Sequence, residues 1–172
     1  NADLMRSIVV TEHGVPEDMS IVVGPSLRPD IGEVRVGVHA IGINFPDLLQ
    51  ISGEYQTIPP RPFSPGKEVA GEVLSVGAGV TRVKPGDRVM VQIEYGGYAE
   101  EVVARQENCF VMPPGLSMVK AAAMGIVYIT AWFGIVDRGQ FRFGETVLIT
   151  GAAGGCGTAA IQIVRALGGR AI

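Results

Sequence analysis

The 172-residue sequence has no strong excess of charge. Only 18% of its residues are charged, its formal net charge is −3, and its lysines and arginines form no cluster. A protein that binds nucleic acid usually presents such a cluster to the phosphate backbone. We therefore expect no nucleic-acid partner.

Cysteines and long apolar runs are also scarce. Cys109 and Cys156 stand far apart and no C-x-x-C pair occurs, so the sequence indicates no disulfide framework. No run of about 18 uncharged apolar residues predicts a membrane span. The first residues lack the basic and apolar regions of a signal peptide. In a metabolic protein these absences favour a cytoplasmic location.

Glycine and proline, by contrast, are abundant, with 24 and 11 residues. They separate short β-rich runs, among them 5–11, 20–23, 33–43 and 68–76. The alternating valines after residue 33 are typical of a half-buried strand. A short helix begins near Pro46 and ends at Gly53. The pattern predicts a compact all-β barrel or sandwich with one small helix.

The sequence changes in character at Ser117. The following stretch is rich in alanine and predicts helices over 117–124 and 127–137, with Ser117 as the N-cap. "FRFGETVLITG" then predicts a turn and a fully apolar strand, as in the buried centre of a parallel sheet. We expect a β-rich domain over residues 1–120 and the start of an α/β domain over 121–172.

A glycine-rich turn, "GAAGGCG", spans residues 151–157 between this strand and a predicted helix. The start of a helix offers unpaired N–H groups and a partial positive charge, and glycine lets a phosphate approach the backbone closely. The strict G-x-G-x-x-G spacing is not met, because Ala152 occupies the first glycine position before Gly154 and Gly157. The turn predicts dinucleotide binding, with a βα turn that binds no ligand as the alternative.

Several motifs occur in one order along nearly the whole chain: "INFPDLL…SGEY", "PGKEVAGEV", "VKPGDRV", "GGYAEE", "ITAWFGI" and "GAAGGCGTAAIQIVRALGG". In this order the sequence resembles the medium-chain dehydrogenase/reductase superfamily, most closely its zinc-free quinone oxidoreductase branch and the related enoyl-thioester reductases. The resemblance implies a β-rich GroES-like catalytic domain, followed by the first part of an α/β Rossmann domain with a doubly wound parallel sheet. It also implies a homodimeric subunit of about twice this length, so we expect residues 1–172 alone to be inactive.

The resemblance implies an NADPH-dependent enzyme, with NADH as the alternative cofactor, that reduces a small quinone or an α,β-unsaturated carbonyl. Zinc-dependent relatives carry cysteine and histidine where this sequence has Asn44 and Lys67, which offer neither thiolate nor imidazole. We therefore expect no metal site, and without a Lewis acid alcohol oxidation is disfavoured. Two alternatives stay open: an enoyl-thioester reductase, and a non-enzymatic GroES-like binding module.

The resemblance also suggests catalytic residues, each with a structural alternative. Asn44, in the "GIN" motif, would lie near the nicotinamide ribose and the substrate carbonyl, or would simply cap a helix. Asp47 would orient active-site groups, or would be present only because the helix dipole stabilises an acidic side chain in the first turn. Tyr55 would donate a proton to the substrate oxygen or bind it, or would pack on a loop.

The cofactor would be bound by Asn44, by Thr130 near the nicotinamide carboxamide, and by the glycine-rich turn. The alternative for Thr130 is a hydrogen bond to its own helix. For Lys67 we favour a surface position, with a place near the cleft that would favour an anionic substrate as the alternative. For Tyr95 and Tyr98 we favour the core, with a place in the lining of the cleft as the alternative. The residues expected to hold the pyrophosphate are Ala153, Gly154, Gly155, Cys156 and Gly157.

Overall fold

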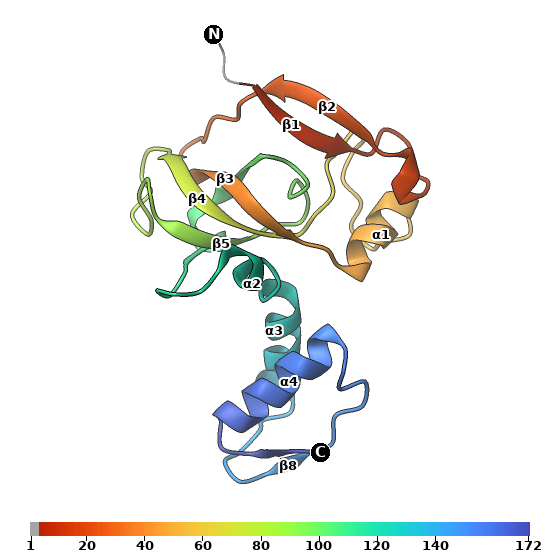
Figure 1. The fold of residues 1–172 in the computed structure, drawn as a ribbon, viewed down its shortest axis with the longest axis vertical. Helices are drawn as coiled ribbons and strands as arrows, with labels where there is room; N and C mark the ends of the chain where they lie inside the picture. The colour runs from red at the N-terminus through yellow and green to blue at the C-terminus, as the bar shows by residue number, and fades with distance from the viewer. Residues whose placement is uncertain (1–3) are drawn as a thin grey trace. The chain divides into compact units, whose positions relative to one another are not determined.

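The structure of the protein is a computed structural model that describes residues 4–172 (Figure 1). The chain divides into two compact units, one ending at Ala123 and the other spanning Met124–Ile172. The sequence predicts the division after residue 120. Within residues 4–172, no helix combines the length and the apolar character needed to cross a membrane.

The first unit is built on antiparallel strands. β1 (Leu4–Val9) and β2 (Ser20–Pro25) form a hairpin. Five further strands form a sheet in the order β6-β3-β4-β5-β7. Their bounds are Glu33–Gly42 for β3, Glu68–Val76 for β4, Arg88–Gln92 for β5, Glu101–Arg105 for β6 and Cys109–Val111 for β7.

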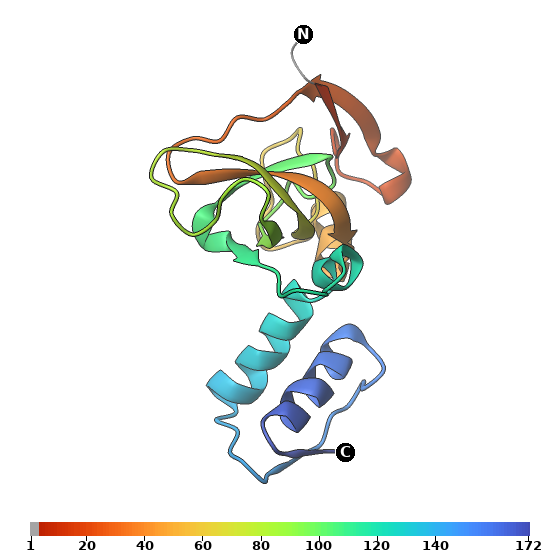
Figure 2. The same ribbon diagram turned by 60° about the vertical axis from the view of Figure 1, so that its left-hand side comes forward.

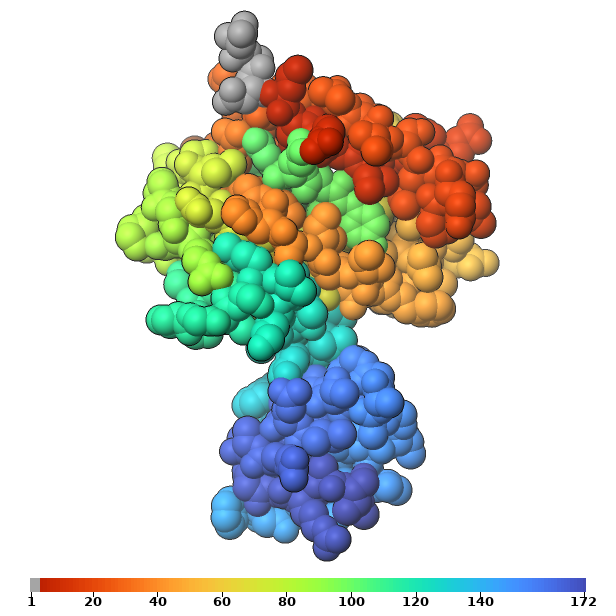
Figure 3. Space-filling view, in the orientation of Figure 1, coloured from red at the N-terminus to blue at the C-terminus, as the bar shows by residue number. Residues whose placement is uncertain are grey.

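Alternating valines bury one face of this sheet, as the sequence predicts. Val34 and Val36 of β3 are fully buried, and they share one core with Val69, Val89 and other residues of the neighbouring strands. Because successive residues of a strand point to opposite faces, valines at every second position line one side of the sheet. The β1–β2 hairpin lies against the segment that leads into β6, since the Ile8 N–H donates to the carbonyl of Tyr98 (Figure 3).

The described part of the first unit also contains two helices, α1 (Phe45–Ser52) and α2 (Met118–Ala122). It contains two short 3-10 turns as well, Pro16–Asp18 and Gln106–Asn108. The bounds of α1 confirm the expected short helix: it ends at Gly53, whose φ of 81° is left-handed. Ser117 caps α2 as predicted, because its hydroxyl accepts the N–H of Lys120.

The second unit packs two helices side by side (Figure 2). α3 (Gly125–Trp132) continues into the π-helix Phe133–Arg138 and meets α4 (Gly155–Ala166) through small side chains. β8 (Thr146–Val147) pairs in parallel with β9 (Arg170–Ala171). The buried residues at the contact of the two helices are Ala131, Ala159, Ala160 and Ile163.

The parallel strand predicted before the glycine-rich turn is present, but within residues 4–172 it is short and not buried. The strand is only two residues long, and the next residue, Leu148, is 73% exposed. A central parallel strand is buried when strands flank both its edges and helices cover both its faces. Within residues 4–172, the only strand that pairs with β8 is β9.

Candidate active site and dinucleotide-binding turn

The N-terminus of α1 holds two of the predicted catalytic residues together. Asn44 is the N-cap residue, and its backbone N–H donates to the Asp47 carboxylate over 2.8 Å. Pro46 suits the first turn because its fixed φ is helical and its missing N–H is not needed there. Asn44 therefore takes part in the helix cap through its backbone, while its side chain bonds to another residue.

That partner is Glu68, the first residue of β4. The Asn44 side-chain Nδ2 donates to Glu68 Oε1 over 2.7 Å, and Glu68 is only 3% exposed. Gly42 makes room for this contact, since a Cβ at that position would lie 2.4 Å from Glu68 Oε1 and 2.3 Å from the carbonyl oxygen of Ala122. The bond fixes the orientation of the Asn44 amide.

Asp47 is fully buried and bonds to a second distant residue. Its Oδ2 accepts the hydroxyl of Tyr98 over 3.2 Å. Burial raises the pKa of Asp47. The hydrogen bonds from Asn44, Tyr98 and the backbone of Gly66, together with the charge of Lys67, oppose that shift. Burial and the neighbouring carboxylate also raise the pKa of Tyr98, which stays protonated as a donor.

Tyr55 lies beside Lys67, a short distance along the chain from the end of α1. The Lys67 ammonium sits 4.7 Å from the centroid of the Tyr55 ring. Lys67 is 7% exposed, so the prediction of a surface position is wrong. It is buried because its Nζ donates to both the backbone oxygen and the carboxylate of Glu94, each over 3.0 Å.

Tyr95 and Tyr98 differ from the prediction of core positions. Tyr95 is 48% exposed, and its ring meets Phe63 edge to face with 6.5 Å between centroids. Tyr98 is partly buried, and its hydroxyl joins the polar cluster instead of an apolar core. A phenol suits such a place because one end is apolar and the other needs a hydrogen-bond partner.

The glycine-rich turn forms the start of α4. Gly154 is the N-cap, and Gly155, Cys156 and Gly157 are the first three helical residues. Gly157 is buried. A Cβ at this position would lie 2.4 Å from the carbonyl oxygen of Gly151, so only glycine fits. Of the other expected contact residues, Ala153, Gly154, Gly155 and Cys156, all are exposed.

These features suit a phosphate. The first N–H groups of a helix have no partner within the helix, and they point along its axis with a partial positive charge. The first turn of α4 contains no acidic residue that would compete for them. The residues of the turn therefore fit the pyrophosphate of a dinucleotide.

Thr130, the other expected cofactor residue, is exposed on α3 in the same unit as the turn. The structure thus gathers the predicted residues in two groups. The first unit holds Asn44, Asp47 and Tyr55, and the second holds Thr130 with the turn.

No group of three or more His, Cys, Asp or Glu side chains among residues 4–172 is arranged to hold a metal ion. His13 and His39 are exposed. At the two positions where zinc-dependent relatives have cysteine and histidine, the side chains bond to carboxylates: Asn44 to Glu68 and Lys67 to Glu94.

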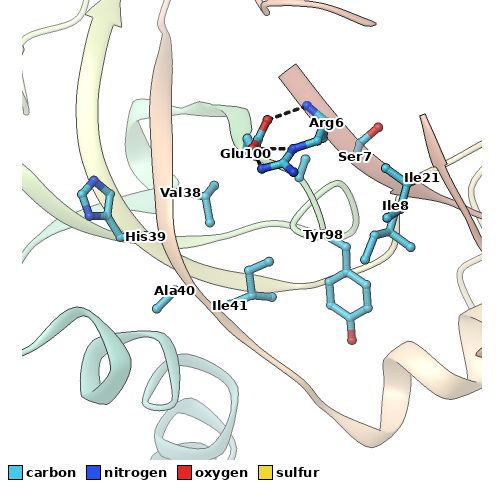
Figure 4. Close-up of a pocket in the computed structure, with 11 residues that line it drawn as sticks. Arg6, Ser7, Ile8, Ile21, Val38, His39, Ala40, Ile41, Tyr98 and Glu100 are labelled. Carbon is cyan, nitrogen blue, oxygen red and sulfur yellow. Dashed lines mark hydrogen bonds and ion pairs between the residues drawn. The ribbon is translucent and has the colours of Figure 1, made fainter. Parts of the chain in front are cut away.

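A separate cavity of about 430 Å³ opens between the β1–β2 hairpin and β3 (Figure 4). Its walls are largely apolar, with Ile8, Val38 and Ile41 among them, and the Arg6–Glu100 ion pair lies along it. Tyr98 also lines it. The predicted catalytic and cofactor residues are not in its lining, so we assign it no role in the reaction.

Sequence reasoning missed Glu68, Tyr98 and Glu94 as partners of the site. Glu68 carried a signal: a carboxylate at the start of an apolar strand, in "KEVAGEV", is costly to bury without a partner. Glu94 carried none, because nothing in its neighbourhood indicates a contact with residue 67.

Comparisons with known proteins agree with this architecture. Residues 30–166 match the model of the alcohol dehydrogenase GroES-like domain family. The rat synaptic vesicle membrane protein VAT-1 homolog is 40% identical over 163 residues, which are 94% of this chain and 40% of that protein. The rat quinone oxidoreductase is 41% identical over 169 residues, 96% of this chain and 51% of that protein. The chain thus spans about half the length of these curated relatives.

Solved structures show the same extent of similarity. The quinone oxidoreductase of Thermus thermophilus, also solved in its complex with NADPH, superposes with a TM-score of 0.83 at 37% identity, covering 96% of this chain and 52% of that one. The CurK enoyl reductase superposes with a TM-score of 0.89 at 27% identity, covering 99% and 54%.

Proposed function

The chain belongs to the alcohol dehydrogenase GroES-like domain family, within the medium-chain dehydrogenase/reductase superfamily, and from that premise we propose a zinc-independent NADPH-dependent oxidoreductase. Its substrate is a small quinone or an α,β-unsaturated carbonyl. The observation that carries the proposal is the exposed turn at the start of α4, which the buried Gly157 allows to pack closely on the helix at Gly151.

The proposed cofactor contacts follow from the two groups of residues. The pyrophosphate lies on Ala153–Gly157 and accepts N–H groups of the first turn of α4, while the Gly154 N–H donates to the carbonyl of Gly151. Thr130 and Asn44 contact the nicotinamide end. The bound cofactor supplies a hydride to the acceptor. NADPH is supported by the Thermus relative, whose structure was solved with it; NADH is the alternative.

The residues of the first unit orient the acceptor and deliver a proton. Asn44, fixed by its bonds to Asp47 and Glu68, positions the acceptor carbonyl. Tyr55 donates a proton or a hydrogen bond to the oxygen that gains negative charge. Asp47 holds the first turn of α1 in place. Such a site works mainly by orientation and by electrostatic support of the developing charge.

Zinc independence is proposed from the side chains at the two positions named above. An amide and an ammonium group do not replace a thiolate and an imidazole as zinc ligands. We also propose that the longest natural form of the protein is a cytoplasmic homodimer, as the family resemblance implies.

The test is acceptor-dependent oxidation of NADPH and NADH by the longest natural form of the protein. We expect turnover with a small quinone or an enone and much slower reaction with simple alcohols. Tyr55→Phe should lower kcat by about a hundredfold or more, the lower end of the range for a lost proton donor. Robust alcohol oxidation combined with silence toward quinones and enones would contradict the proposal.

An enoyl-thioester reductase is the second candidate, favoured by the similarity to the CurK enoyl reductase. The same assay separates the two, because a clear preference for an enoyl thioester over the quinone and the free enone identifies this activity. A binding module without catalysis would show no cofactor oxidation with any acceptor.

A further inference from the structure

Lys67 is a buried cation that the proposed reaction does not use. Its side chain is 8% exposed, whereas the Glu94 carboxylate that pairs with it is 70% exposed. Burying an ammonium group is costly unless other groups compensate it. Its surroundings therefore indicate what holds it in place and what it holds in turn.

Its anchor is the backbone at Glu94. The carbonyl oxygen of Glu94 accepts the Lys67 ammonium over 3.0 Å and the Nε2 of Gln50 over 3.1 Å. Gln50 is fully buried in α1, and its Nε2 also donates to the carbonyl of Thr57 over 3.2 Å. The ammonium is thus tied to the same backbone atom as α1 and the segment that follows it.

Tyr55 belongs to that following segment. It comes two residues after Gly53, and its N–H donates to the carbonyl of Leu49 over 3.0 Å. These bonds place the backbone of Tyr55. Its side chain is half-buried, and the ammonium of Lys67 lies 4.7 Å from the ring centroid.

We propose that Lys67 is a positioning residue for Tyr55: its ammonium, anchored on Glu94, holds the ring by a cation–π contact and so fixes the phenol hydroxyl for the acceptor. This role rests on the proposed function of Tyr55. A cation over the face of an aromatic ring is attracted by the negative potential of that face, and more strongly when water is excluded. A neutral, unbranched side chain such as methionine fills most of the space but does not provide this attraction.

Four variants separate positioning from simple packing. Lys67→Met keeps an unbranched apolar stem and removes the ammonium, Lys67→Arg keeps the charge, and Tyr55→Phe keeps the ring but removes the hydroxyl. Lys84→Met is the matched control, because Lys84 is 79% exposed and pairs with Asp87 on the surface. Circular dichroism and thermal unfolding establish that each variant is folded.

In steady-state kinetics, we expect Lys67→Met to lower kcat by about tenfold, with little change in the KM for NADPH, and Lys67→Arg to restore most of the loss. In the Tyr55→Phe background, Lys67→Met should change kcat by less than about twofold, since contacting residues that act through one group are not additive. Equal effects of Lys67→Met in both backgrounds, or no effect in either, would overturn the proposal.

An NMR measurement without substrate or cofactor keeps this test separate from the proposed function. The Lys67 Cε protons, assigned by their absence in Lys67→Met, should be shifted upfield by the Tyr55 ring. The shift should persist in Tyr55→Phe and vanish in Tyr55→Leu. If the wild type reduces no acceptor, the proposed function fails, and this shift alone decides whether Lys67 holds the ring; its absence refutes the inference.

Discussion

A substitution at Gly154 tests the phosphate site with the least disturbance to the fold. Gly154 is the N-cap of α4, with φ of −78° and ψ of 171°, an extended conformation that any residue adopts. A Cβ at this position meets only the carbonyl oxygen of Gly151, at 3.4 Å. Gly155 is a poorer choice, because its Cβ would lie 2.9 Å from Cγ1 of Val127, so that packing and charge would change together.

The informative pair is Gly154→Asp and Gly154→Asn. Aspartate and asparagine have the same shape and cap helices equally well, so both variants should fold at least as stably as the wild type. Both also compete similarly for the N–H groups of the first turn. They differ by one negative charge, and that charge sits where the pyrophosphate is proposed to bind.

The magnitude follows from Coulomb's law. For each unit of phosphate charge about 6 Å away, at an effective dielectric constant of about 40, the repulsion is about 1.4 kcal/mol. The two charges of a pyrophosphate give about 2.8 kcal/mol, or roughly a hundredfold in affinity, and salt at physiological strength reduces this to between about tenfold and a hundredfold.

Isothermal titration calorimetry with NADPH, at low and high salt, measures the effect on the longest natural form of the protein. We expect Gly154→Asp to bind at least tenfold more weakly than Gly154→Asn, with the ratio shrinking as salt rises. Equal affinities of the two variants, in a wild type that binds NADPH, would show that the phosphate lies elsewhere.

Three further predictions concern stability and metal content. Burial raises the pKa of Asp47 in the folded state. The free energy of unfolding that its protonated form contributes at acidic pH is therefore lost as the pH rises through that raised pKa. Asp47→Asn should flatten this loss, measured by urea unfolding from about pH 4 to 8. The hydrogen bonds and charge of Arg35 lower the pKa of Glu101, so its stabilisation is lost as the pH falls through the lowered value. Glu101→Gln should therefore cost about 1.5–3 kcal/mol near neutral pH, measured in the same way. Elemental analysis of protein prepared without added metal should find no stoichiometric zinc.

The sequence predicts those parts of the structure that depend on neighbours along the chain. The helix after Asn44 carries its own signals, Pro46 at the start and Gly53 at the end, and its bounds agree with them. The strand alternation at Val34 and Val36 is likewise local, and these side chains are buried as expected.

Where the sequence fails, the deciding contact is distant. The burial of Lys67 depends on Glu94, 27 residues away, and on a turn that no local pattern reveals. Similarly, the apolar residues around Leu148 have the composition of a buried strand, but burial requires neighbours on both edges and both faces. Composition shows that a segment is able to be buried, whereas the surrounding elements decide whether it is.

The two groups of site residues also differ in how much folding free energy they cost. The turn of α4 uses backbone N–H groups that every helix start leaves unpaired, so it adds little cost of its own. α1 buries the side chains of Asp47 and Gln50, and Gln50 Oε1 makes no hydrogen bond to the protein. Such a buried oxygen costs about 1–3 kcal/mol. Apolar side chains of similar volume would avoid that cost but would leave Asn44, Tyr98 and the backbone at Glu94 without their partners, so this cluster is explained better by positioning than by stability.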